Sequence, residues 1–292
     1  MKNKKDSLFS NIPAPALVIS AIICYQLGAA IATHLFSSLG PGGTVLFRIG
    51  FSAIFLIIAG KGLPKHIDKK MLLWTILYGL SLAGMNFAFY TSFSKIPLGV
   101  AATIEFIGPL AIAFLGSKKL EDFIFVLMAA IGIVLFAPWT GGSVDPVGIV
   151  FALFAAVCWA FYILLAAKVG KLLPGRSGLT LAMTFGTITM LPIGIIQAGV
   201  HLLSPVAIIG GLLVAFLSST LPYSFEIEAL RKIPPHIFGI LVSLEPAIAT
   251  IAGVFLLHQS LTIRDSVALM LVTAASIGVT MHKKTNEEAV IE

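Results

Sequence analysis

Four ionisable side chains lie within long apolar runs of this chain, three of them well inside and Glu226 closer to the end of its run. Glu105, Glu226 and Glu245 are carboxylates, and Arg48 carries a guanidinium group. If the runs cross a bilayer, each charge costs about 2.5 to 3.5 kcal/mol on insertion scales, so it should face a cavity or a partner. A carboxylate there can hold a proton or an ammonium group, and a guanidinium can hold a carboxylate. For any single site a hydrogen bond between packed helices is the alternative, but several sites together favour binding.

Two of the glutamates stand beside prolines. Glu105, in AATIEFIGPLAIAF, precedes Pro109 by four residues, and Glu245 directly precedes Pro246. Proline has no N–H and clashes with the carbonyl four residues back, which for Pro109 is the carbonyl of Glu105. Gly108 loosens the same turn. We therefore expect helix kinks at Gly108, Pro109 and Pro246, although at Pro246 alone a plain packing kink is an equal alternative.

Further polar and aromatic side chains fall at similar depths. Asn86 and Tyr90 are four residues apart, hence on one helix face. Arg48 can also extend towards the outer surface, and Trp and Tyr also serve as packing and interface residues. Glu228 lies near the cytoplasmic edge, where we expect it to be solvated or paired with Arg231. The predicted substrate-binding or proton-coupling residues are Glu105, Glu245, Glu226, Asn86, Tyr90, Tyr25, Gln26, Trp159, Tyr162, Tyr223 and Arg48.

The composition predicts the elements that position these residues. Of 292 residues, 58% are hydrophobic and 11% are charged, and the mean hydropathy is +1.02. Apolar runs of about 17 to 23 residues match the thickness of a hydrocarbon core. The chain is therefore predicted to be an all-α, multi-pass membrane protein. Its ten predicted spans are 14–36, 42–60, 71–93, 97–116, 122–138, 147–169, 178–198, 206–228, 235–257 and 264–282.

The basic residues predict the orientation of these spans. A net charge of +6 can indicate nucleic-acid binding, but 16 of the 19 Lys and Arg residues fall in alternate connections. The other side receives only Lys95 and Arg264, and Arg48 lies within a span. The positive-inside rule then predicts that both termini are cytoplasmic, with a lipid bilayer and no nucleic acid as partner.

The chain also repeats itself. KIPLGVAATIEFIGPLAIAFLG from Lys95 matches KIPPHIFGILVSLEPAIATIAG from Lys232 at a shift of 137, and the earlier spans match at a shift of 134. Five spans per half is an odd number, so the second half must be inverted. We predict repeats at 1–140 and 141–284 and a cytoplasmic tail at 285–292. Because the first span then has a counterpart, it is not expected to be a cleaved signal peptide. Glu105 and Glu245 are not symmetry mates, which suits an unsymmetrical ligand.

With these repeats and motifs, the sequence resembles the EamA-type drug/metabolite transporters. The resemblance covers nearly the whole chain. Within that superfamily, YGLSLAGMNFAFY, PLGVAATIEFIGPLAIA, CWAFYIL, STLPYSFEIEAL and SLEPAIATIAG are similar to bacterial inner-membrane threonine/homoserine exporters. The resemblance implies a basket-like arrangement of ten helices around a cavity lined by spans one, three, four, six, eight and nine. It also implies that Glu105, Glu245 and Glu226 project into this cavity. Glu228 is not part of the exporter pattern, so the resemblance does not decide whether Glu226 or Glu228 is the functional carboxylate of span eight.

These observations predict a secondary exporter of small amino acids, threonine or homoserine first, in a bacterial inner membrane. Proton coupling through the glutamates and transport without coupling both remain open. The main alternative is export of other metabolites or drugs, such as aromatic or hydrophobic amino acids or nucleobases; a non-transporting scaffold is more distant. No GxSxG, HExxH or intramembrane Asp pair indicates an enzyme. No cofactor or metal is expected, and Cys24 and Cys158 are expected to pack as small apolar residues.

Overall fold

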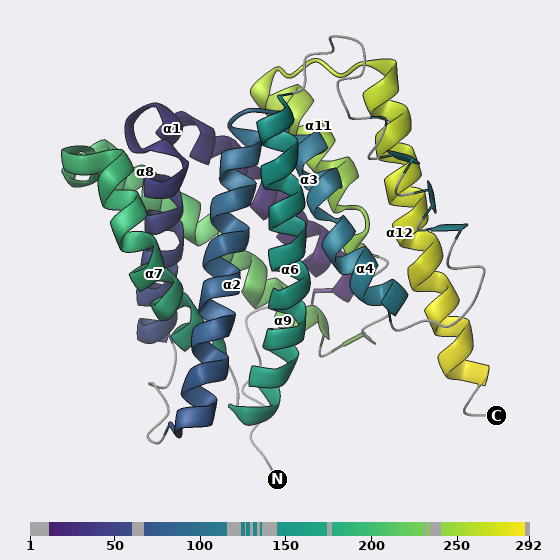
Figure 1. Ribbon diagram of the computed structural model, residues 1–292, viewed down its shortest axis with the longest axis horizontal. Helices are drawn as coiled ribbons and strands as arrows, with labels where there is room; N and C mark the ends of the chain where they lie inside the picture. Colours follow the sequence, from purple (N-terminus) through teal and green to yellow (C-terminus); the bar gives the residue numbers. More distant parts are fainter. Residues whose placement is uncertain are drawn as a thin grey trace.

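The computed structural model describes residues 12–59, 67–115, 124–125, 127–128, 131–132, 135, 145–173, 177–230, 232–233 and 241–289. All regular elements in these ranges are helical (Figure 1). They are α1 (Ala14–Ala59), α2 (Lys69–Phe93), α3 (Leu98–Glu105), α4 (Ile107–Leu115), α6 (Pro146–Leu172), α7 (Ser177–Ala198), η1 (Gly199–Leu203), α8 (Pro205–Ala215), η2 (Phe216–Thr220), α9 (Leu221–Leu230), α11 (Glu245–Leu257) and α12 (Ile263–Ala289).

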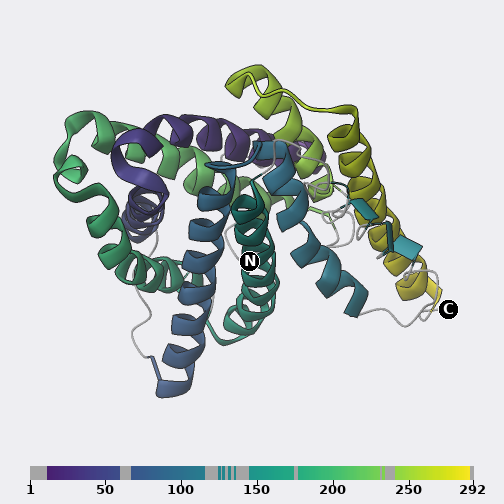
Figure 2. The same cartoon turned by 45° about the horizontal axis from the view of Figure 1, so that its top comes forward.

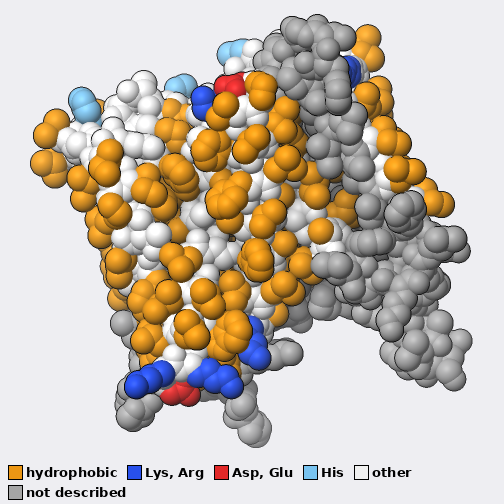
Figure 3. Space-filling model, in the orientation of Figure 1, with side chains coloured by type: hydrophobic (Ala, Val, Ile, Leu, Met, Phe, Trp, Pro, Cys, Tyr) orange, Lys and Arg blue, Asp and Glu red, His pale blue; other side chains and the backbone are white. Residues whose placement is uncertain are grey.

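The outside of the helical assembly is apolar. Five of the described helices are long and apolar enough to cross a membrane, and two shorter apolar helices cover Leu98–Ile112 and Glu245–Leu257. In the face drawn in Figure 3, hydrophobic side chains cover the middle, whereas the Lys, Arg, Asp and Glu side chains lie towards the two ends. This distribution is that of a protein whose middle contacts lipid and whose ends contact water, so the predicted all-α, multi-pass class is confirmed.

Helix α1 contains two of the predicted spans. Its 46 residues would extend about 69 Å as one straight helix, more than twice a hydrocarbon core. Gly40 interrupts it, with φ 64 and ψ 172, a conformation that glycine adopts without a Cβ penalty. The second half of α1 starts at Pro41, and the Gly42 N–H donates to Gln197 Oε1 at 2.7 Å. An α7 side chain therefore caps the second half of α1.

Small residues let the central helices approach closely. Helices α2 and α6 run side by side (Figures 1 and 2). The Ser81 hydroxyl donates to the Cys158 carbonyl at 2.6 Å, and the Ser92 hydroxyl donates to the Gly148 carbonyl at 2.8 Å. Hydroxyl-to-carbonyl bonds of this kind and small residues are the usual means of helix association in membranes. Cys24 and Cys158 are both free thiols.

The remaining predicted spans correspond to the observed helices with two differences. Span eight is built from α8, one π-helical turn η2 and α9 in continuous sequence. Helix α12 continues to Ala289, beyond the predicted span end at 282, because its polar end can stay helical outside a membrane. It lies beside α4 and α11 (Figure 2). Most of the predicted span 122–138 and the start of span nine lie outside the described residues.

Candidate functional site

Arg48 is held against the π-helical turn of span eight. Its Nη2 donates to the Ser218 carbonyl at 2.9 Å, and its Nε donates to Ser219 Oγ at 3.4 Å. One turn further along α1, Ser52 Oγ lies 3.2 Å from the Ala215 carbonyl oxygen. A π turn widens the helix and frees backbone groups, and such turns occur often at functional sites. Arg48 is only 8% exposed, so the structure does not use the alternative of extending it to the outer surface.

Tyr90 forms the other side of the arginine pocket. The Arg48 guanidinium carbon lies 5.2 Å from the centroid of the Tyr90 ring, within the range of a cation–π interaction. Tyr90 is fully buried, and its hydroxyl has no hydrogen-bond partner among the described residues. Asn86, one turn earlier on α2, donates to the Leu82 carbonyl at 2.8 Å. The predicted shared face of Asn86 and Tyr90 thus lies in the interior.

Three glutamates on other helices are linked to the arginine, two of them directly and Glu226 through Glu245. Glu105 ends α3 and is 8% exposed, whereas Glu226 on α9 and Glu245 at the start of α11 are half-buried. Glu245 interacts electrostatically with Glu105, with Glu226 and with Arg48, and Glu105 also interacts with Arg48. The structure therefore brings together one cation and three carboxylates that are far apart in sequence.

This group differs from a metal centre. Within the described part of the chain, no three His, Cys, Asp or Glu side chains converge closely enough to hold a metal ion. The carboxylates lie around a guanidinium instead, so a charged or zwitterionic organic ligand matches the group better than a metal cation does.

Aromatic side chains fill the space between these charges. The rings of Tyr25 and Tyr223 meet edge to face at 6.2 Å. Trp159 of α6 packs edge to face on Phe106, next to Glu105, at 5.6 Å. The Tyr25 side chain also interacts with the Glu226 carboxylate. Gln26, its neighbour in sequence, is 4% exposed, and its amide needs a partner inside the protein.

Sequence reasoning missed Tyr78. Its ring lies 5.2 Å from that of Tyr162, and its side chain interacts with the Tyr162 hydroxyl. The signal was available: Tyr78, Leu82, Asn86 and Tyr90 recur every four residues and therefore share one face of α2. Ser218 and Ser219 were also missed, because nothing in FLSST distinguishes a π turn from an ordinary apolar helix.

The predicted kink residues lie at contacts between helices. The α3–α4 boundary falls at Phe106, between Glu105 and Pro109. A Cβ on Gly108 would collide with the Ala156 backbone carbonyl of α6, so this glycine permits a close helix crossing. Pro246 is buried in the first turn of α11, directly after Glu245.

Glu228 is buried rather than solvated, which differs from one of the two expectations for it. It is 8% exposed, and its Oε1 lies 3.8 Å from Lys232 Nζ. One turn on a helix brings these two side chains together, whereas Arg231 lies outside the described residues. Glu226, by contrast, interacts with Glu245 and with the Tyr25 side chain.

Comparison with known proteins identifies the family of this chain. Residues 146–281 match the EamA-like transporter family. The threonine/homoserine exporter RhtA of Salmonella typhimurium (strain SL1344) is 38% identical over 272 residues, 92% of either chain. RhtA of Escherichia coli (strain K12) is 37% identical over 267 residues, 91% of this chain and 90% of that protein. The chain belongs to the EamA-like transporter family.

The fold has also been seen in a crystal structure. That structure superposes on this EamA-like chain with a TM-score of 0.60 at 17% sequence identity, covering 94% of this chain and 98% of the other. At that identity the likeness concerns the fold alone. It extends over nearly all of both chains, so the helical arrangement is that of a complete known architecture.

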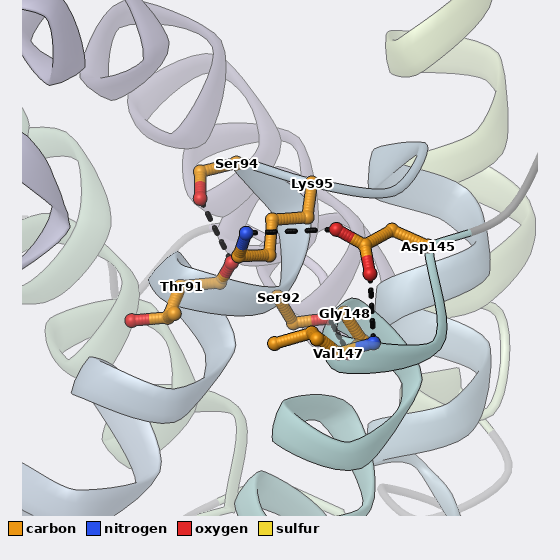
Figure 4. Close-up of polar contacts among 7 residues, drawn as sticks. All are labelled: Thr91, Ser92, Ser94, Lys95, Asp145, Val147 and Gly148. Carbon is orange, nitrogen blue, oxygen red and sulfur yellow. Dashed lines mark hydrogen bonds and ion pairs between the residues drawn. The ribbon is translucent and has the colours of Figure 1, made fainter.

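The KIP turns of this EamA-like protein make related contacts at opposite ends. Lys95 Nζ lies 3.5 Å from Asp145 Oδ2, and Asp145 also caps α6 by accepting from the Val147 N–H at 2.8 Å (Figure 4). Lys232 Nζ, its partner in the predicted repeat, donates to the Ile12 carbonyl just before α1 at 2.7 Å. Each lysine thus contacts a residue just before a helix that is distant in sequence, Asp145 before α6 and Ile12 before α1.

Proposed function

We propose that this protein is an inner-membrane secondary exporter of small amino acids, with threonine and homoserine as the first candidate substrates. One observation carries the proposal: a buried arginine stands among three glutamates in the interior of a membrane protein. An α-amino acid presents a carboxylate for Arg48 and an ammonium for a glutamate. The names of the RhtA relatives support the same substrate class.

The arginine geometry suits a substrate carboxylate. A guanidinium offers five N–H donors in a plane, and two nitrogens of Arg48 already bind Ser219 and the Ser218 carbonyl. These two contacts fix the plane of the group while further donors can bind a carboxylate. Tyr90, stacked at 5.2 Å, limits its movement further. Such preorganisation lowers the entropy cost of binding.

The proposal includes ten spans in two inverted repeats, both termini cytoplasmic and alternating access. Three observations support it. The lysines of the two KIP turns contact the opposite half at opposite ends. The family match at 146–281 falls in the second predicted repeat. The lower end in Figure 3, where α2 begins and α6 ends in Figure 1, has a cluster of Lys and Arg, as expected for a cytoplasmic face.

Proton exchange is the proposed energy source. Glu105 or Glu245 would hold a proton in one state and the substrate ammonium in the other. The electrostatic interaction between these two glutamates and Arg48 supports this exchange, because a bound ammonium or a bound proton each removes one excess negative charge from the group.

The function is tested by substrate exchange in proteoliposomes. Vesicles containing the purified protein and excess unlabelled threonine or homoserine should take up the labelled amino acid. Arg48→Gln should raise the KM for this uptake about 10- to 100-fold, because a hydrogen bond to a charged group contributes about 1.5 to 3 kcal/mol. Arg264→Gln, which removes an arginine near the start of α12, is the matched control and should behave as the unaltered protein does.

The alternative of another metabolite or a drug is supported by the aromatic pairs Tyr25–Tyr223 and Phe106–Trp159. Flat apolar molecules bind well between such rings. The same vesicles, tested with aromatic amino acids and nucleobases, separate the two. Exchange of those compounds without exchange of threonine or homoserine would replace the proposal; exchange of no solute would favour a scaffold.

A further inference from the structure

The five tyrosines of the chain gather in its interior. They are Tyr25, Tyr78, Tyr90, Tyr162 and Tyr223. Tyrosines of membrane proteins are usually enriched where the helices meet the headgroups. Here Tyr78 and Tyr90 are buried, Tyr25 and Tyr223 interact with Arg48, and Tyr162 interacts with Tyr78, Tyr223 and Tyr25. The chain has 21 phenylalanines, so the interior uses tyrosine where a purely apolar ring would also have filled the space.

Four of these tyrosines form a connected row. Tyr78 on α2 meets Tyr162 on α6 with ring centroids 5.2 Å apart. The Tyr162 side chain also interacts with Tyr223 on α9. Tyr223 in turn packs on Tyr25 of α1 with centroids 6.2 Å apart, and Tyr25 reaches Glu226. We call Tyr78, Tyr162, Tyr223 and Tyr25 the tyrosine row.

The tyrosine row carries hydroxyl groups that helix packing alone does not require. Moving a hydroxyl into an apolar environment without a hydrogen bond costs about 1 to 3 kcal/mol in proteins, and phenylalanine would avoid that cost. Tyr162 lies between two other hydroxyl-bearing side chains. Tyr25, Tyr162 and Tyr223 also keep some accessible surface, although side chains of several helices surround them. They therefore offer hydroxyls to a molecule that enters between the helices.

From this arrangement we propose that the tyrosine row binds the hydroxyl of the substrate side chain and so selects hydroxylated amino acids over apolar isosteres. The inference rests on the proposed function and deepens it. Arg48 and the glutamates bind the carboxylate and the ammonium, which all amino acids share. Tyr223 and Tyr25 of the tyrosine row interact with this charged group. The row then binds the side chain, which differs from one amino acid to another.

The expected selectivity is moderate. A site whose hydrogen-bonding groups stay unpaired with the wrong ligand can reject it by about 10⁴-fold. Here the tyrosines can bond to one another when the ligand lacks a hydroxyl, so only part of that penalty applies. We expect threonine to be preferred over valine, which has a methyl in place of the hydroxyl, by about 10- to 100-fold.

The test compares threonine with valine, and homoserine with norvaline, in the proteoliposome exchange assay. In Tyr162→Phe the threonine-to-valine ratio of kcat/KM should fall about 10-fold, with the loss on the threonine side. Tyr78→Phe should lower the ratio in the same direction and serves if Tyr162→Phe does not fold. Thr75→Val is the matched control, because Thr75 is buried on α2 and its hydroxyl bonds to the Met71 carbonyl of its own helix at 2.7 Å.

Each outcome bears on one proposal. If the unaltered protein exchanges threonine and valine equally, the amino-acid exporter stands and the tyrosine row does not select. If both tyrosine variants lose threonine and valine exchange in equal proportion, the hydroxyls have only a structural effect and the inference is overturned. If the unaltered protein exchanges no amino acid, the proposed function fails first and the inference fails with it.

Discussion

At the scale of single residues, uncharged groups hold the Arg48 guanidinium in place. Arg48 is fixed by one serine hydroxyl, one backbone carbonyl and one tyrosine ring. Glu105 of α3 and Glu245 of α11 interact with it, and Glu226 of α9 interacts with Glu245. None of these contacts is local in sequence, so the site exists only once the spans have packed.

Glu105 gives the prediction that belongs to this scale. In proteoliposomes with an imposed pH gradient, Glu105→Gln should lose the stimulation of threonine efflux by the gradient, because glutamine can bind an ammonium weakly but cannot exchange a proton. Substrate exchange without a gradient should persist at a reduced rate. Glu228→Gln is the control, since that carboxylate lies 3.8 Å from Lys232. A gradient response in Glu105→Gln equal to that of the unaltered protein would remove Glu105 from the proton path.

Much of the group could be predicted because charge inside a membrane is conspicuous. Glu105, Glu226, Glu245 and Arg48 stand out against an apolar background. Tyr78 and Ser218 do not, since hydroxyls are frequent in spans and usually bond to their own helix. The partners of Arg48 could not be predicted because they lie on a π turn, and a π turn has no sequence pattern of its own. The choice of Lys232 as the partner of Glu228 depended on side-chain directions that sequence spacing alone leaves open.

At the scale of elements, close helix crossings set the distances between the charges. Gly108 brings α4 against the Ala156 carbonyl of α6. The same crossing positions Glu105, three residues earlier, near Cys158 and Trp159 of α6. Sequence reasoning predicted that Gly108 loosens a helix; the contact with α6 shows a packing function that needed the partner helix to be known.

Gly108→Ala should therefore destabilise the protein by about 1 to 3 kcal/mol, the usual cost of inserting a methyl group into a packed interior. Thermal unfolding in detergent would measure the change. Gly170→Ala, on α6 where an added Cβ meets nothing within 4 Å, should be neutral or slightly stabilising. Equal unfolding temperatures for the two variants would contradict the close α4–α6 crossing.

At the scale of the whole molecule, lysines contact segments distant in sequence at both ends of the helical assembly. Lys95 contacts Asp145 at one end, and Lys232 contacts the Ile12 carbonyl at the other. Ten apolar runs and a duplication marked by the two KIP turns were predicted from the sequence, because length, hydropathy and these turns are local features, and the duplication stays a prediction. Which end each lysine would contact, and through which atoms, required the assembled helices.

The end contacts predict opposite effects of two substitutions. Asp145→Asn removes the charge but keeps a good helix cap, so the end near Lys95 should open more often, by up to about fivefold for a surface pair of up to 1 kcal/mol. Lys232→Gln should reduce opening at that same end. The readout is the rate of thiol labelling at Ser92→Cys, with Cys24 and Cys158 replaced by serine. Labelling that changes in the same direction in both variants would contradict the coupling.

The different chemistry of these two contacts gives the molecule an uneven response to its surroundings. The Lys95–Asp145 pair is 38% and 37% exposed, so it weakens as ionic strength rises. Lys232 and Glu228 are only 24% and 10% exposed, and Lys232 also donates to a backbone carbonyl, so salt screens that end less. Added salt should therefore loosen the Lys95 end before the Lys232 end.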